Sequence, residues 1–263
     1  MESMFSRLAE ALAVSEIGPK VALTAALAAD WHAGKLDYRD ASPAELMCGR
    51  PAKPALLPHK DVPNRSPGTP EGRARLLHAI VHIEFSAINL ALDHAARFRG
   101  LPQAYYADWI GVAAEEAEHF MLLRDRLQSL GYDYGDFPAH AGLWDMAEKT
   151  ADDVLARMAL VPRLLEARGL DATPPIQMKL EQVGDHESAR VLDIILRDEI
   201  THVGLGDRWF RYLCAERGIE PESTYLDLLT RYQAPWPQGK LNESARLAAG
   251  FSAGELAALA KKR

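Results

Sequence analysis

Apolar residues recur along this chain at helical spacing almost throughout, and the alternation typical of β-strands is nearly absent. Residues 1–33 predict one or two helices, interrupted at Gly18-Pro19. Between Ser42 and Pro70, seven prolines exclude a long helix and predict an extended connector. The first quarter of the chain is therefore expected to precede the main helical body.

Four long helical stretches follow the connector. Thr69-Pro70-Glu71 combines a capping hydroxyl, a first-turn proline and an early acid, so a helix should begin there and reach about Arg99. The second helix is expected over residues 103–130, and the third over 143–168, where Gly169 ends it. The fourth should run from Pro175 to Arg217, with a bend or break at Gly184. Helices of this length with short links predict an all-α fold, a four-helix bundle.

The same pattern divides the chain into three regions. Residues 1–69 form N-terminal helices and a proline-rich connector packed on the bundle, residues 70–218 the bundle, and residues 219–263 a C-terminal extension. The last region ends in a short helix over 252–262 and is too small for an independent domain, so we expect it to pack on the bundle.

Composition and charge exclude several classes of protein. With 48% hydrophobic and 25% charged residues, the chain is neither disordered nor fibrous. A net charge of -7 argues against a surface that grips nucleic acid, although four connector cations leave tRNA open as a partner: Arg50, Lys53, Lys60 and Arg65. No uncharged apolar run of about 18 residues and no signal peptide appear, which predicts a cytoplasmic protein without a membrane span. Cys48 and Cys214 belong to no metal or disulfide pattern.

Carboxylates occupy core-facing positions of three predicted helices. Glu84 lies in the apolar stripe of the first, since Ile80, Ile88 and Ala91 share its helix face. Glu116 and His119 lie three residues apart on the apolar face of the second helix. Glu199 and His202 repeat that spacing in the fourth.

A carboxylate in an apolar interior costs several kcal/mol unless it is paired, and divalent cations remove that cost. Glu-x-x-His places a carboxylate and an imidazole about one turn apart on one face. Two such pairs, with one further Glu from each of two other helices, form the di-iron or di-manganese site of ferritin-like bundles. A structural role, as buried salt bridges or a solvated face, is the alternative.

Spacing predicts the fourth carboxylate. Glu84 precedes Glu116 by 32 residues, and 33 residues before Glu199 stands Glu166. Pro162 should bend this helix and turn Glu166 inward. Rival acids lie on the same helix: Glu148, Asp152 and Asp153.

Two acids beside the ligands are predicted to accept hydrogen bonds from the metal-bound histidines. Glu115 and Asp198 directly precede the two motif glutamates, and we expect them to reach the histidine of the neighbouring pair. For Glu115, a surface salt bridge is the alternative. No catalytic residue beyond the metal ligands is expected.

These residues carry a family resemblance over about residues 20–255. The chain resembles the ferritin-like superfamily, and within it a bacterial family known only as a domain of unknown function; it is distantly similar to di-iron tRNA hydroxylases. The segments concerned are HIEFSAINLALDHAARF, EEAEHFMLLRDRLQSLGY, PRLLEARGLDA, ILRDEITHVGLGDRWF and GKLNESARLAAGF. The resemblance implies a bundle with a di-metal site and names no substrate.

Four carboxylates and two imidazoles suit two Fe ions, with Mn as the alternative. The expected activity is an O2-dependent oxygenase or oxidase acting on a small molecule, with dioxygen or peroxide as co-substrate. The chain lacks a flavin, nicotinamide or iron–sulfur fingerprint, so electrons would come from an external donor. A ferroxidase or peroxide-handling protein and a non-catalytic metal-binding bundle remain alternatives, and the oligomeric state is open.

Overall fold

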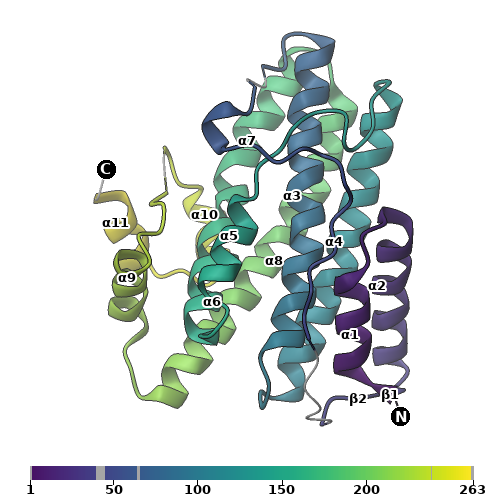
Figure 1. Cartoon of the computed structure of the whole chain (residues 1–263). Coiled ribbons are helices and arrows are strands. Elements are labelled where there is room, and N and C mark those ends of the chain that lie inside the picture. Colours follow the sequence, from purple (N-terminus) through teal and green to yellow (C-terminus); the bar gives the residue numbers. More distant parts are fainter. Residues whose placement is uncertain (1, 40–44, 64–65, 238, 262–263) are drawn as a thin grey trace. The chain divides into compact units, whose positions relative to one another are not determined.

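The computed structural model describes residues 2–39, 45–63, 66–237 and 239–261. The chain folds into two compact units, Met1–Trp144 and Asp145–Arg263, and is helical in most of its described length (Figure 1). An all-α fold is thus confirmed. Arg65, one of the four connector cations, lies outside the described residues.

Unit 1 is built on a long helix hairpin. Helix α3 (Pro70–Arg97) packs along α4 (Gln103–Ser129). Thr69 caps α3 by accepting a hydrogen bond from the Gly72 amide, as the capping pattern predicted. An 18-residue window of α3 is apolar enough to cross a membrane, but 78% of that window is buried in the structure, as in the core helix of a soluble protein.

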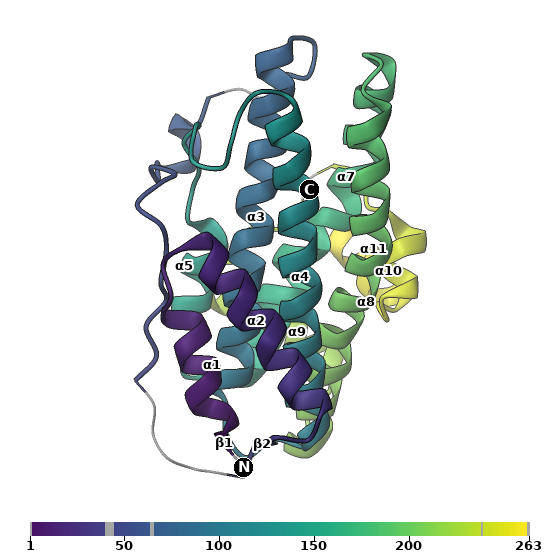
Figure 2. The ribbon, with the colours of Figure 1, turned by 90° about the vertical axis from the view of Figure 1, so that its right-hand side faces the viewer.

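Two shorter helices cover this hairpin. Helix α1 (Met4–Ala13) contacts α3, and α2 (Ile17–His32) contacts both α1 and α4 (Figure 2). Strands β1 (Glu2–Ser3) and β2 (Leu36–Asp37) form a small parallel pair. The break between α1 and α2 falls just before the predicted Gly18-Pro19, which lies in the first turn of α2, where a proline needs no amide partner.

The connector runs over unit 1 in mostly irregular conformation. Its described part contains one short 3-10 helix, η1 (His59–Asp61). The Leu57 amide donates to the Ala139 carbonyl and the Ala139 amide to the Ala55 carbonyl, so the connector pairs with the loop that follows α4.

The structure departs most from prediction over residues 142–182, nearly all of which belong to unit 2. The expected helix over 143–168 is divided into α5 (Gly142–Lys149), α6 (Val154–Leu160) and a π-helical turn, η2 (Val161–Glu166). Helix α7 (Ala167–Gln182) then runs through Gly169 and the proline pair, correcting the predicted stop. The chain reverses at Gly184, whose φ of +78° is the left-handed conformation that ends a helix.

Helix α8 (His186–Arg217) packs against α6, η2 and α7, and three short helices complete unit 2. They are α9 (Pro221–Arg231), α10 (Glu243–Ala248) and α11 (Ala253–Lys261). Arg246 of α10 forms an ion pair with Asp171 of α7, which ties the C-terminal region to the long helices. A four-helix arrangement across the two units stays a prediction.

Candidate metal centre

Three predicted ligands meet in the core of unit 1. Glu84 comes from the middle of α3, and Glu116 and His119 lie one turn apart on α4. Their side chains are 4%, 1% and 3% exposed. The helical periodicity that placed them in apolar stripes therefore predicted their burial correctly.

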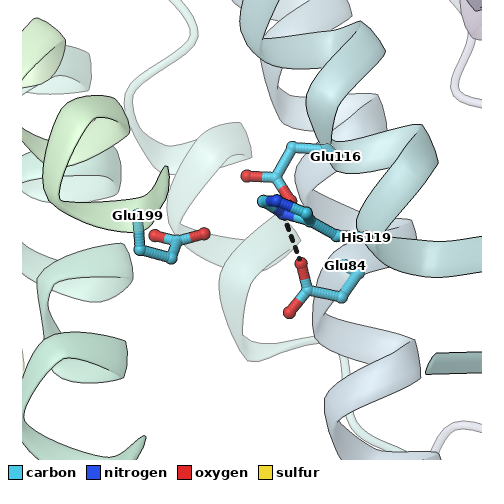
Figure 3. Close-up of side chains that lie close together, drawn as sticks. All are labelled: Glu84, Glu116, His119 and Glu199. Atoms are coloured by element: carbon cyan, nitrogen blue, oxygen red, sulfur yellow. Dashed lines mark ion pairs between the residues drawn. The ribbon is translucent and has the colours of Figure 1, made fainter. Parts of the chain in front are cut away.

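The three side chains point toward one another (Figure 3). His119 Nδ1 lies 3.5 Å from Glu84 Oε2 and 3.5 Å from Glu116 Oε2. One potential ligand atom from each residue lies within 4.8 Å of the others. Two donors that bind one ion at about 2.1 Å each are at most roughly 4.2 Å apart, so the histidine-to-carboxylate distances fit a shared ion.

The electrostatics of this cluster favour a cation between the carboxylates. Burial lowers the pKa of His119, but its hydrogen bonds and charge interactions with Glu116 and Glu84 outweigh burial and raise that pKa to about 11. Without metal, His119 therefore carries one positive charge, which balances one of the two carboxylates. A divalent ion bound by neutral imidazole supplies two positive charges and balances both carboxylates. Carboxylate with imidazole suits Fe(II), Mn(II) or Zn(II).

Unit 2 contains the second Glu-x-x-His pair, in the middle of α8. His202 Nδ1 lies 3.6 Å from Glu199 Oε1, within reach of one ion. The His202 side chain is fully buried, whereas that of Glu199 is 13% exposed. Glu199 is a candidate metal ligand, and Figure 3 draws it on α8.

Glu166, the predicted fourth carboxylate, ends the π-helical turn η2 and is half-buried. The turn begins next to Pro162, where a helix bend was predicted. A π turn is frequent at functional sites because it redirects side chains that a regular helix would place elsewhere. The role of Glu166 as a ligand stays a prediction.

The two acids predicted to reach the histidines directly precede the motif glutamates. Glu115 is exposed on α4. Asp198 is 26% exposed, and its Oδ1 lies 2.9 Å from Nε of the neighbouring Arg197. Their action on a metal-bound histidine stays a prediction.

An ionic cluster that holds η2 in place escaped the sequence analysis. The buried Arg163 donates to Asp207 of α8 at 2.6 Å and to Glu255 of α11. Arg211 binds the same two acids at 2.8 and 2.9 Å. Asp207 lies between Val203 and Phe210 on the apolar face of α8, so the signal that identified the glutamates was also present there.

The described structure is that of a helical protein with carboxylate–histidine clusters able to hold a metal. Residues 13–257 match the family described as "Protein of unknown function (DUF455)", and the chain belongs to that family. An uncharacterized protein of Haemophilus influenzae is 49% identical over 227 residues, which cover 84% of this chain and 79% of that relative. No solved structure matches the chain.

Proposed function

We propose that this chain is a ferritin-like di-metal protein whose two Glu-x-x-His pairs, with Glu84 and Glu166, together hold two iron ions or, alternatively, two manganese ions. The observation that carries this proposal is the repeated local geometry: in each unit a buried histidine Nδ1 lies 3.5 or 3.6 Å from a carboxylate on the same helix face. One such pair would be ordinary. Two in register, each 32 or 33 residues after another glutamate, match the duplicated ligand set of such proteins.

The activity we propose is O2-dependent oxidation or oxygenation of a small organic molecule. Two iron ions in a carboxylate site supply the capacity to bind and reduce dioxygen or peroxide. The residues of this chain hold the ligand geometry and keep bulk water from the site, for which the buried trio of unit 1 is suited. Electrons would come from an external donor, and we place the protein in the cytoplasm.

The number of residues outside the four long helical stretches favours a substrate-oxidising enzyme over an iron-storage protein. About 70 residues precede α3 and about 45 follow α8, more than a bare bundle needs. We assign these additions to binding a substrate, and prefer a metabolite to tRNA because the chain carries a net charge of -7.

Metal content tests the ligand assignment. Glu116→Gln and Glu199→Gln each remove one ligand charge at nearly constant volume, and Glu118→Gln removes the same charge from an exposed position of α4. After anaerobic loading with Fe(II), elemental analysis should give about two irons per wild-type or Glu118→Gln chain. Each ligand variant should bind less than half of that. Wild-type iron content in both ligand variants would refute the site.

Oxygen consumption separates the proposed activity from its alternatives. Fe(II)-loaded protein mixed with O2 should oxidise its bound iron once, and a substrate with an electron donor should then sustain O2 uptake. Many irons deposited per chain would show a ferroxidase instead. Bound iron that does not react with O2 would show a structural metal site.

A further inference from the structure

A cavity of unit 1 lies between the connector and α3, away from the metal ligands. Its polar lining comes from Cys48 and Arg50 of the connector and from His82, Ser86 and Asn89 of α3. Ser86 and Asn89 are two and five residues beyond Glu84, which places them roughly 140–200° around the helix from that glutamate. The cavity is therefore separate from the carboxylate–histidine trio.

The charge of this cavity is unusual for an acidic protein. Its lining, within the part of the chain that the structure describes, includes no aspartate or glutamate. Arg50 is exposed, and it makes no hydrogen bond or ion pair with another described residue. His82 adds no charge, because its ring nitrogens bond the Tyr134 hydroxyl and the His140 carbonyl, and burial lowers its pKa to about 4. Arg50 is thus an unbalanced positive charge at the cavity wall.

A second cation stands directly behind this wall. The Lys20 side chain is fully buried, and its Nζ donates to the Ala11 and Leu12 carbonyls and, at 2.7 Å, to Asn89 Oδ1. All three acceptors are neutral, and among the described residues Lys20 has no carboxylate partner. A buried ammonium without a carboxylate partner is costly, so an anion nearby would be stabilised.

Cys48 lies beside this ammonium. The Gly49 amide donates to Leu12 O at 2.8 Å, the same carbonyl oxygen that accepts from Lys20 Nζ. Burial lowers the pKa of Lys20 to about 8, and the charge of Cys48 acts against that shift. The Cys48 thiol is half-buried in the cavity wall, so it can report on what enters the cavity.

We infer that this cavity binds the carboxylate group, or an anion of similar size, of a small molecule, with Arg50 and Lys20 supplying the charge and Asn89 linking Lys20 to the wall. The cavity volume of about 30 Å³ holds roughly two water-sized groups, which matches the two oxygens of a carboxylate. This site does not depend on the proposed metal centre, since it lies on another face of α3.

Alkylation of Cys48 tests the inference. Its thiolate attacks the methylene carbon of iodoacetate or iodoacetamide, forming an S–C bond as the C–I bond breaks and iodide leaves. Both reagents react with the same thiolate, so the thiol pKa affects the two rates equally. The ratio of the rates therefore measures how strongly the site prefers the anionic reagent. The rates are measured by mass spectrometry on the Cys48 peptide. Buried Cys214, whose pKa burial raises to about 11, is the internal control.

The reference is a synthetic peptide of residues 45–51, which contains both Cys48 and Arg50 without the cavity. We expect the iodoacetate-to-iodoacetamide rate ratio to be at least about fivefold higher in the folded protein than in the peptide. Arg50→Gln should move the ratio most of the way to the peptide value. Arg190→Gln removes the same charge at an exposed site of unit 2 and should leave it unchanged. A peptide-like ratio in the wild-type protein overturns the inference.

Competition provides a measurement that needs no variant. At constant ionic strength, acetate should slow alkylation of Cys48 by the neutral iodoacetamide, and acetamide should not. Lys20→Met, checked for wild-type helix content by circular dichroism, should weaken the protection by acetate. Equal effects of acetate and acetamide would show that the cavity does not select a carboxylate.

Discussion

The two Glu-x-x-His pairs share one sequence motif but lie in different surroundings. In unit 1 the motif stands on α4, which packs along an uninterrupted neighbour, α3, and all three charged side chains are at most 4% exposed. In unit 2 the motif stands on α8, whose neighbours are the short α6, the π-helical η2 and α7, and the Glu199 side chain is 13% exposed. The first pair is therefore a closed ion cluster, whereas the second leaves one carboxylate within reach of water.

This difference indicates how each unit tolerates the absence of metal. The closed cluster of unit 1 must offset its own charge, which protonated His119 does in part for Glu84 and Glu116. Glu199 is partly exposed and keeps some of its hydration, so its charge depends less on stabilisation by His202.

The largest predicted effect comes from removing the histidine of each pair. In metal-free protein, His119→Leu leaves two buried carboxylates without their cation and should lower the free energy of unfolding by about 3–5 kcal/mol. His202→Leu should cost only about 1–2 kcal/mol, because Glu199 is partly hydrated. Urea unfolding of the chelator-treated variants measures both values. Equal losses would show that the two pairs do not differ as we describe.

The pH dependence of the unfolding free energy tests whether the charge of His119 causes the predicted loss of stability. A histidine with a raised pKa contributes stability that is fully present below its unfolded pKa of about 6.5 and is lost as the pH rises through the folded value, about 11 here. The cost of His119→Leu should therefore be greatest near pH 6.5 and shrink steadily toward pH 10. A cost independent of pH would mean that His119 acts by packing alone.

The two units also differ in how much of their structure could be predicted from the sequence. In unit 1, the Thr69 cap, the helix ends near Arg97 and Ser129, and the burial of the three ligands all follow from local signals that agree with one another. Periodicity places a side chain on a face, and regular helices keep it there. The cavity beside Cys48 could not be predicted, because it depends on how an irregular connector lies on α3.

In unit 2, local signals conflict. Gly169 resembles a helix stop and Pro174-Pro175 a helix start, yet α7 runs through all three. Tertiary packing outweighs propensity there: Leu170 is buried, and Asp171 pairs with Arg246 from 75 residues away. The π turn before α7 likewise depends on Arg163 contacts with distant acids, which no local pattern reveals.

The π turn η2 should therefore depend on acids of the C-terminal region. Glu255→Leu removes one acid from the cluster that holds Arg163, and leaves a buried guanidinium incompletely paired. We expect a loss of about 3 kcal/mol in unfolding free energy, with faster amide exchange in η2 and α11 than in α3 and α4. Glu243→Leu, at an exposed position of α10, is the matched control and should change neither measurement. Uniformly faster exchange in both units would contradict a local role.

The smallest effect comes from a pair of glycines, one in each unit. Gly111 lies inside α4 with nothing within 4 Å of an added Cβ, so Gly111→Ala should stabilise the protein by about 0.5–1 kcal/mol through helix propensity alone. A Cβ at Gly206 of α8 would lie 2.6 Å from Pro162 Cβ, at the start of the π turn. Overpacking there should outweigh the same propensity gain and give a net loss of about 1–2 kcal/mol. Thermal unfolding of the two variants compares them directly. If both alanines stabilise the chain, η2 can move away from α8 at little cost, and the predicted overpacking at Gly206 is wrong.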